Sequence, residues 1–280
     1  MRIIYILLTV AAVVVCDAPG VSFALNNKVE ASYVSGSSEG SWEEIDMSAF
    51  TLSYTRYFQA LSDDVSPYGA REFLQHPSYI GGCFAQTESE GYLKSLSVME
   101  IDQKTDDYTV SGMFYAGDDR STGLGLRYKY RDGEAKGTYP SVIREESLAF
   151  TIHQYLTDSI RIGLDYERRN RDEPLSDLDV YTVDAIALIE KYRLSGWYRY
   201  MDTDNERMGV EFGVYPKKKL GMFVSYEIAY EYMDFASRLK LKGEYWISRR
   251  TNASIVYEMA EADSGDSQAD TVMLRLGLLF

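Results

Sequence analysis

The end of the chain constrains its fold most strongly. The last ten residues, 271–280, read TVMLRLGLLF, and side chains along a strand alternate between two faces. One face of this strand would carry only apolar side chains, namely Val272, Leu274, Leu276, Leu278 and Phe280. In water an exposed edge of this kind recruits other strands, whereas a closing strand in a lipid-embedded barrel has both edges paired. The end of the chain therefore predicts a membrane β-barrel.

The beginning of the chain predicts a secretory signal. Arg2 precedes an apolar run over residues 3–15, which is shorter than the roughly 20 apolar residues that a transmembrane helix needs. Residues 22–24, Ser-Phe-Ala, form a small–x–small cleavage site. We therefore expect residues 1–24 to be removed as a signal peptide and residues 25–280 to form the barrel.

The two cysteines leave no disulfide framework in the mature chain. Cys16 lies in the predicted signal, so Cys83 remains alone. The alternative to signal cleavage is lipidation at Cys16. The three valines at 13–15 lack the small residue that usually precedes a lipidated cysteine, which favours cleavage.

The composition narrows the classes of partner. The chain has 280 residues and a formal net charge of −14, so it offers no basic surface of the kind that binds nucleic acid. Its mean hydropathy of −0.28 is compatible with a barrel in lipid, because lipid-facing and lumen-facing residues alternate and cancel in the average. The 24 tyrosines fit the two aromatic girdles that such barrels place at the membrane interfaces.

Period-two alternation recurs along the chain in runs of strand length. Over residues 239–247, lysine and glutamate fall on alternate positions, and a helix would spread these charges around its circumference. The predicted strands cover 28–35, 46–58, 107–116, 121–131, 146–156, 159–169, 177–189, 192–202, 207–215, 219–232, 236–247, 252–262 and 271–280.

Two further alternating runs, 79–86 and 92–101, would bring the count to fifteen. A single-chain barrel with both ends inside needs an even number. We therefore expect one run between 78 and 103 to be irregular, or the two to merge into one long, bulged strand. The prediction is an all-β, antiparallel up-and-down transmembrane barrel of about 14 strands, with 12 or 16 as alternatives. A short helical insert is expected near 67–75, between two prolines.

The breaks between the runs are of two kinds, which alternate along the chain. The short breaks are 117–120, 157–158, 190–191, 216–219 and 249–252. The longer, more acidic breaks are 132–146, 170–177, 202–207 and 261–270. Outer-membrane barrels have short periplasmic turns and longer outer loops, so we expect the short set to face the periplasm.

Charged residues gather on the second face of the strands, which must point away from lipid. An Arg or Lys in the middle of the lipid face costs roughly 2–4 kcal/mol. The predicted charged lumen wall consists of Arg127, Lys129, Arg131, Arg161, Asp165, Glu167, Asp184, Arg193, Arg199, Glu211, Glu227, Glu231, Lys240, Lys242, Glu244, Glu258 and Arg275. One interpretation is a hydrated pore whose wall sets ion preference, and the other is a salt-bridged filling that passes nothing.

Residues suited to catalysis or metal binding are few. The sequence contains only His76 and His153, and a lone histidine on a barrel wall lacks the partners of a nucleophilic site. There is no phosphate-binding glycine loop and no Cys/His cluster with metal spacing. We expect no enzyme activity, no cofactor and no metal. The acidic segments 202–206 and 261–266 are either Ca²⁺ ligands or, as we favour, solvated loops.

Residues 54–58, YTRYF, and 66–74, SPYGAREFL, resemble the N-terminal signature of the bacterial general porins. In that family a strand ending in Tyr-Tyr-Phe runs through a Pro-rich link into a Pro-x₅-Phe-Leu segment. Pro67, Phe73 and Leu74 keep this spacing. The resemblance implies an outer-membrane β-barrel of the general porin type, and it indicates no particular solute.

The chain also departs from that family. Ala60 stands where the family often has proline, and residues 69–72 differ from its usual centre. The last strand resembles the sorting signal that the barrel-assembly machinery reads in outer-membrane barrels generally. On this resemblance Leu276, Leu278 and Phe280 act as the assembly signal, which concerns location and not activity.

Taken together, these features predict a Gram-negative outer-membrane porin that passes small polar solutes or ions by passive diffusion. The expected partners are outer-membrane lipid, the barrel-assembly machinery during insertion and the solutes themselves, with no nucleic acid. The chain would cross the periplasm after cleavage near Ala24. The first alternative is a non-conducting structural or surface-binding barrel whose acidic loops recognise a partner. The second is a barrel hydrolase that uses His153.

Overall fold

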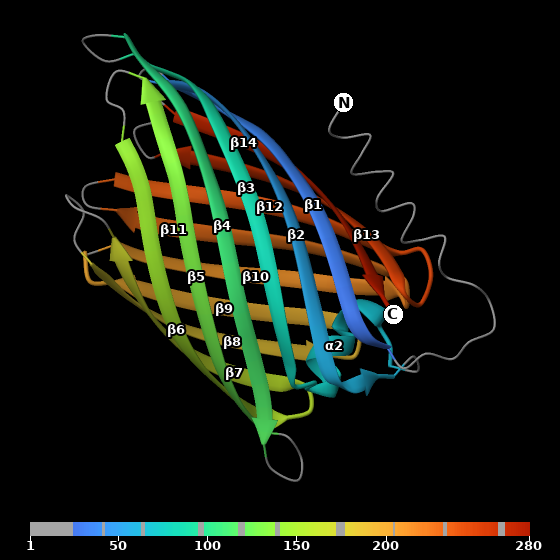
Figure 1. The fold of residues 1–280 in the computed structure, drawn as a ribbon. Coiled ribbons are helices and arrows are strands. Elements are labelled where there is room, and N and C mark those ends of the chain that lie inside the picture. The colour runs from blue at the N-terminus through green and yellow to red at the C-terminus, as the bar shows by residue number, and fades with distance from the viewer. Residues whose placement is uncertain are drawn as a thin grey trace.

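Fourteen antiparallel strands close into one barrel in the computed structural model of the chain (Figure 1). Each strand pairs with its neighbours in sequence, and β1 pairs with β14 to complete the ring. The structure describes residues 25–40, 43–62, 65–94, 98–116, 121–137, 141–171, 177–203, 205–231, 234–262 and 267–280. The predicted signal, residues 1–24, lies outside this part of the chain. The predicted barrel of fourteen strands is confirmed.

The elements follow one another in the order of an up-and-down barrel, with one short helical insert after the second strand. They are β1 (Leu25–Gly40), β2 (Glu43–Leu61), η1 (Tyr68–Ala70), α2 (Arg71–Gln75), β3 (Tyr79–Lys94), β4 (Val98–Ala116), β5 (Thr122–Gly137), β6 (Ser141–Thr157), β7 (Ile160–Arg171), β8 (Leu178–Ile189), β9 (Tyr192–Met201), β10 (Asn205–Lys217), β11 (Leu220–Glu231), β12 (Asp234–Trp246), β13 (Thr251–Ala262) and β14 (Ser267–Leu279).

The segment 78–103 contains a hairpin in place of the irregular run or long, bulged strand that the sequence favoured. β3 ends at Lys94, β4 begins at Val98, and these two residues face each other in the register. The alternating run predicted at 92–101 is thus divided between the end of β3 and the start of β4. The pattern at 92–101 therefore passes through the turn without a visible break, and the expected treatment of this segment is wrong although the total is right.

The first six strands are longer than the rest. β2 and β4 have 19 residues each, whereas β9 has 10. A membrane-spanning strand needs roughly 9–11 residues, so one side of the barrel rises beyond the membrane thickness. The segment 132–146, predicted to be a long acidic loop, belongs mostly to β5 and β6, where Asp132 faces Arg144.

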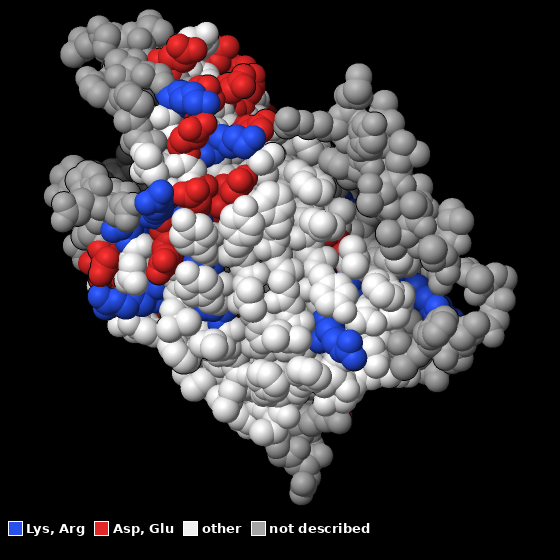
Figure 2. Space-filling view, in the orientation of Figure 1, with Lys and Arg blue, Asp and Glu red and all other residues white. Residues whose placement is uncertain are grey.

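The outer surface carries the apolar face of the strands. Large apolar side chains such as Val110 (57% exposed), Leu124 (54%) and Phe150 (53%) point away from the barrel. In Figure 2 the charged side chains of the visible face gather toward one end, and the central part is mostly uncharged. Such a band is the surface that hydrocarbon covers in outer-membrane barrels. In the described part of the chain, no helix is long and apolar enough to cross a membrane.

The seam of the barrel joins the two ends of the described chain. β1 and β14 are paired from Lys28 with Leu279 to Gly40 with Ser267. Beyond them the backbones of Asn27 and Phe280 exchange two hydrogen bonds of 2.8 Å. The predicted closure of the last strand on the first is therefore observed, with a longer ladder than residues 29–34 alone.

Candidate functional site

The interior of the barrel carries the charged face of the strands. Two residues that are paired across neighbouring strands point to the same side of the sheet. The register therefore shows which residues of each strand point into the barrel. Arg127 faces Ala149, for example, which in turn faces Glu167. The structure places the following predicted residues on the inward face: Arg127, Lys129, Arg131, Arg161, Asp165, Glu167, Asp184, Arg193, Arg199, Glu211, Glu227, Lys240, Lys242, Glu244, Glu258 and Arg275.

Two other predicted groups lie elsewhere. Leu276, Leu278 and Phe280, the expected assembly signal, lie on the outward face at the end of β14, where Leu278 faces Val29 of β1. The side chain of Glu231 lies outside the part of the structure that is described.

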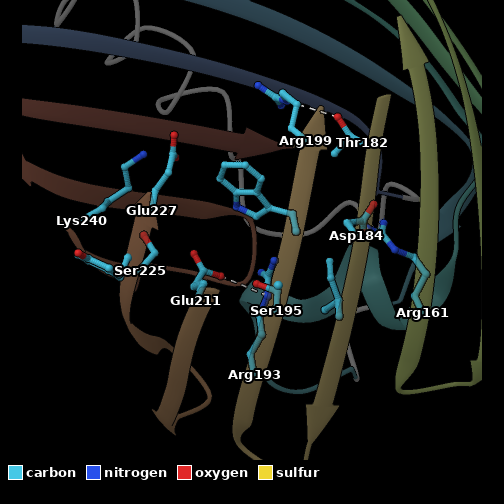
Figure 3. A pocket seen from close by; sticks show the side chains of 14 residues that line it. Arg161, Thr182, Asp184, Arg193, Ser195, Arg199, Glu211, Ser225, Glu227 and Lys240 are labelled. Carbon is cyan, nitrogen blue, oxygen red and sulfur yellow. Dashed lines mark hydrogen bonds and ion pairs between the residues drawn. The ribbon is translucent and has the colours of Figure 1, made fainter. Parts of the chain in front are cut away.

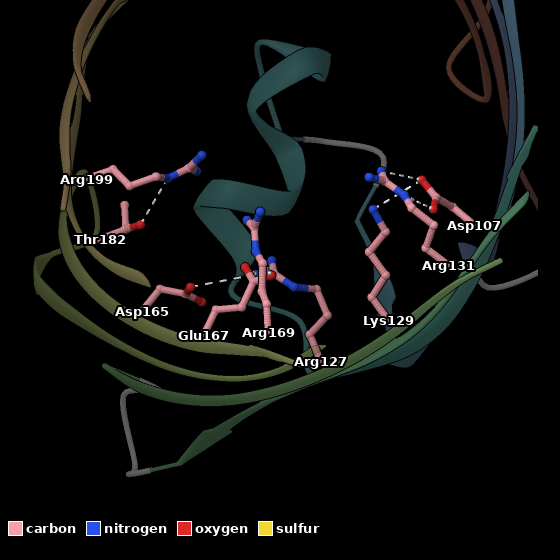
Figure 4. Close-up of polar contacts among 9 residues, drawn as sticks. All are labelled: Asp107, Arg127, Lys129, Arg131, Asp165, Glu167, Arg169, Thr182 and Arg199. Atoms are coloured by element: carbon pink, nitrogen blue, oxygen red, sulfur yellow. Dashed lines mark hydrogen bonds and ion pairs between the residues drawn. The ribbon is translucent and has the colours of Figure 1, made fainter. Parts of the chain in front are cut away.

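One cluster of ion pairs joins β5 to β7 (Figure 4). Arg127 Nη2 lies 3.0 Å from a Glu167 carboxylate oxygen and 3.6 Å from Asp165. Arg169 Nε lies 2.8 Å from the other oxygen of Glu167. One acidic residue on β7 thus lies between two arginines, and the cluster projects from the wall into the interior.

A second cluster centres on Asp107 of β4. Its carboxylate accepts hydrogen bonds from Nε and Nη2 of Arg131, at 2.7 and 3.0 Å, and lies 3.1 Å from Lys129 Nζ. Two parallel N–H···O bonds of this kind give a guanidinium–carboxylate pair its fixed geometry. Here two cations share one carboxylate, so the cluster keeps a positive excess.

The β7–β13 wall continues the same pattern. Arg161 contacts Asp184, and Arg193 Nε lies 3.5 Å from Glu211. Glu258 again serves two cations, because Arg238 and Lys240 lie 3.0 and 2.8 Å from its two oxygens. Lys242 Nζ lies 3.1 Å from Glu244. Ion pairs between strands therefore connect this wall, and positive charge is locally in excess.

Two predicted wall arginines have no carboxylate within 4.0 Å among the described residues. Arg199 donates from Nε to the Thr182 hydroxyl at 3.3 Å. Arg275, on β14, has the sulfur of Met273 at 3.7 Å from Nη2. Neither exception is evident from the sequence, because the pairing of a lumenal charge depends on the register of neighbouring strands.

Small neutral side chains line the opposite part of the wall. The register aligns Ser53, Cys83 and Thr109 across β2, β3 and β4, and Ser32 of β1 faces Thr51 of β2. These residues project little into the interior, whereas the arginines and lysines of β5–β12 reach far into it.

The helical insert, η1 and α2, occupies the interior at the end where the short turns lie (Figures 1 and 4). Its backbone is tied to one of these turns, since Tyr68 N donates to the Lys218 carbonyl at 3.2 Å. The guanidinium of Arg71 is 1% exposed, donates to the Arg249 carbonyl at 3.1 Å and lies 5.5 Å from the Trp246 ring centroid. The predicted helix near 67–75 is present, with Pro67 itself at its N-cap position.

A second set of contacts ties the insert to the barrel wall. Glu72 lies 2.7 Å from Lys28 Nζ of β1, and its side chain is 47% exposed to the interior. Desolvation of this half-exposed carboxyl favours its neutral form, but the Lys28 ammonium, aided by Tyr57 and Arg71, outweighs it, so the pKa of Glu72 is lowered from its ordinary 4.5. On the other side the His76 ring stacks on Tyr155 with 3.5 Å between centroids. The insert is therefore held at several independent points.

Among the residues that the structure describes, the neighbours of His153 do not form the arrangement of groups that hydrolysis by a catalytic triad needs. His153 lies on the inward face of β6, with its Nδ1 at 3.4 Å from Arg161 Nη1 and 3.5 Å from the Tyr115 hydroxyl. Neither neighbour orients a histidine as a carboxylate does in a catalytic triad. Among the described residues, no group of three or more His, Cys, Asp or Glu side chains is placed to hold a metal.

Several interior residues escaped the sequence analysis. Asp107 lies at an inward position of a strand that the sequence predicted. The alternation of inward and outward residues along that strand would have identified Asp107 as an interior residue. Lys28 begins the first predicted strand and Glu72 lies within the predicted helix, and their meeting depends on the insert folding back into the barrel. Other interior residues that were missed include Arg169, Arg207 and Arg238, which lie toward the ends of predicted strands or in a predicted loop.

Comparison with known proteins supports the barrel and leaves the family open. No protein-family model matches the sequence, and no curated protein matches it either. Among solved structures, the outer membrane protein Omp33 of Acinetobacter baumannii is similar with a TM-score of 0.56 and 12% identity, over 92% of this chain and 100% of that chain.

Two further solved structures are similar over nearly the whole chain. A mutant of the monoaromatic hydrocarbon channel TodX matches with a TM-score of 0.59 and 9% identity, over 91% of each chain. The transport unit of the Escherichia coli autotransporter AIDA-I matches with a TM-score of 0.50 and 11% identity, over 97% of this chain and 96% of that chain. At these identities the likeness concerns the fold, and the chain has the fold of bacterial outer-membrane β-barrels.

Proposed function

We propose that the protein is an outer-membrane, porin-like channel that lets small polar solutes or ions diffuse passively. The observation that carries this proposal is the contrast between the two faces of the barrel. The outer face is apolar, whereas charged side chains of β5–β12 stand in an interior that is partly exposed to water. Charged rings or walls of this kind govern which ions enter a pore.

The size of the barrel supports an aqueous interior. Barrels of roughly eight strands are filled by their own side chains, and those of about 16–18 leave a channel. Fourteen strands, with small side chains on the β1–β4 wall, favour an open path beside the helical insert. On this proposal the predicted interior residues line the pore, and the insert narrows it at the end that carries the short turns.

The remaining parts of the proposal concern location and chemistry. We infer cleavage after Ala24, export through the periplasm and insertion by the barrel-assembly machinery, with the last residues of β14 as its signal. We infer no enzymatic activity. The similarity to TodX, which is a channel, and to the transport unit of AIDA-I supports the inference that the protein has no enzymatic activity.

Reconstitution of the purified, folded chain into a planar lipid bilayer tests the proposal. We expect stepwise increases in current as single barrels insert, and a reversal potential under a salt gradient that reports ion preference. A chain that shows the heat-dependent gel migration of a folded barrel and inserts, yet passes no current at any voltage, would contradict the channel function and favour the non-conducting alternative.

A further inference from the structure

Arg199 is exceptional in the β7–β12 wall because it lacks a carboxylate partner among the described residues. An arginine side chain has five N–H donors, and one of those of Arg199 is used by the Thr182 hydroxyl at 3.3 Å. Figure 3 shows the end of this side chain directed into the interior. Its neighbours in the wall differ, since Arg193 and Lys240 each lie within 3.5 Å of a glutamate.

Other cations surround Arg199. Arg207 of β10 faces it directly in the strand register, and Arg169 of β7 also repels it. Glu167 and Glu227 attract it from a distance, but Glu167 already binds Arg169 at 2.8 Å and Glu227 lies 3.9 Å from Arg207. Like charges directly opposite in a sheet oppose folding. The facing pair of Arg199 and Arg207 therefore costs the fold stability, although the Arg199 guanidinium also lies 5.6 Å from the Trp197 ring centroid.

Arg199 itself adjoins open space. A cavity of about 410 Å³ lies along the wall and is lined by Arg199, Trp197 and other residues of β7–β12. A Cβ atom at Gly209 would lie 2.7 Å from the Trp197 ring, so the glycine is what allows the indole to lie flat on β10. The position facing Arg207 on β11 is Ala229, a small uncharged side chain.

We propose that Arg199, Arg207 and Trp197 form a binding site for the oxyanion group, a carboxylate or a phosphate, of a solute in transit. The guanidinium fork matches the geometry of both groups. A bound anion would give Arg199 the negatively charged partner that it lacks among the described residues, and the Trp197 ring beside the Arg199 guanidinium helps to hold that guanidinium in place. That the bound solute is in transit rests on the proposed channel function; the anion site itself does not.

Calorimetric titration of the folded, full chain in detergent micelles with inorganic phosphate, and separately with acetate, tests the site without any need for conductance. At low ionic strength we expect at least one of the two anions to bind, and the pair of titrations identifies the preferred group. Arg199→Gln should weaken that binding roughly 10- to 100-fold, because charge-assisted hydrogen bonds are lost. Arg199→Lys keeps the positive charge and loses the two-pronged guanidinium, so its affinity for the anion should lie between those of the wild type and Arg199→Gln.

Arg144→Gln is the matched control, because this exposed arginine pairs with Asp132 near the far end of β6. It should bind the anion as the wild type does. The site is refuted if neither anion binds the wild type, if Arg199→Gln and Arg199→Lys both bind as tightly as the wild type, or if the control loses as much affinity as Arg199→Gln.

The two proposals fail in different ways. Anion binding in micelles by a barrel that is silent in bilayers would keep the site and remove the channel function. Stepwise conductance without binding of either anion would keep the channel function and remove the site.

Discussion

Arg71 is the most deeply buried charged side chain of the described residues. A buried cation is tolerated when hydrogen bonds and aromatic faces replace its water. Arg71 has both, since it donates to the Arg249 carbonyl and lies 5.1 Å and 5.5 Å from the ring centroids of Tyr68 and Trp246. One residue therefore joins the insert, β12 and the turn that follows β12.

Replacing Arg71 by Met should destabilise the barrel, because a similar volume remains while the charge-dependent contacts are lost. We expect the free energy of unfolding to fall by about 2–4 kcal/mol, from one hydrogen bond to a charged group and desolvated cation–π contacts. Denaturant titration in lipid vesicles measures this change. Arg249→Ala, which keeps the accepting carbonyl, is the control, and equal stability of the wild type and Arg71→Met would contradict the role assigned to Arg71.

The Lys28–Glu72 pair predicts a response to acid. The pKa of Glu72 is lowered in the folded protein, so the stabilisation is complete above the ordinary value of 4.5 and is lost as pH falls through the lower, folded value. We expect the insert to loosen in that window and the conductance to rise. The charged groups that act on Glu72 are Lys28 and Arg71, and the Tyr57 hydroxyl also bonds to it.

The pH response is measured as single-channel conductance between neutral and acidic pH. Glu72→Gln should already show the higher conductance at neutral pH. Its conductance should therefore rise less on acidification than that of the wild type. Other interior carboxylates also titrate, so the difference between the two proteins is the relevant quantity. Identical pH profiles would exclude a role for this pair in holding the insert.

At the level of elements, alternation predicted the strands well and their lengths poorly. Inside the membrane one face of a strand must be apolar, so β11 and β12 stand out in the sequence. The ends of β5 and β6 rise beyond that zone, where both faces accept polar residues. Alternation then disappears while pairing continues, as between Asp132 and Arg144, and the sequence there resembles a loop.

The insert shows a different limit of sequence reasoning. Its boundaries follow from local chemistry, because proline precedes it at Pro67 and follows it at Pro77. Its position inside the barrel depends on contacts with Lys28, Lys218 and Arg249, which are remote in sequence. No local pattern reports such contacts, so the sequence predicts a helix and leaves its place in the molecule open.

Removing the insert tests its part in the proposed pore. Replacement of residues 65–76 by a short Gly-Ser linker should leave a folded barrel, because the ladder between β2 and β3 remains intact. We expect a larger single-channel conductance with a similar ion preference, since the charged wall of β5–β12 is unchanged. A folded variant with the conductance of the wild type would mean that the insert does not narrow the path.

For the whole molecule, the inward face could be predicted because the odd–even rule holds around the entire ring. The pairing inside it could not, because partners such as Arg127 and Glu167 come from strands that are not neighbours in sequence. Which of these cations lacks a carboxylate, as Arg199 does, depends on the register of several strands together. The sequence thus predicts the charged wall and not its chemistry.

The tall wall formed by β1–β6 predicts which end of the molecule faces the outside of the cell. In a Cys83→Ser background, Glu134→Cys near the tip of β5 should react with a membrane-impermeant maleimide on intact cells. Lys191→Cys, in the turn between β8 and β9, should react only after the outer membrane is permeabilised. Val110→Cys on the outer apolar face is the control and should resist labelling. The reverse labelling pattern would show that the barrel has the opposite orientation in the membrane.

The contacts of the insert also set an order of events during assembly. Glu72 needs Lys28 from the first strand, whereas Arg71 needs Trp246 and Arg249 from near the end of the chain. Both sets of partners come together only when β14 has met β1 and the ring is complete. The insert can therefore make its full set of contacts only in a completed barrel. In a chain shortened before Trp246, Arg71 would lack both Trp246 and the Arg249 carbonyl.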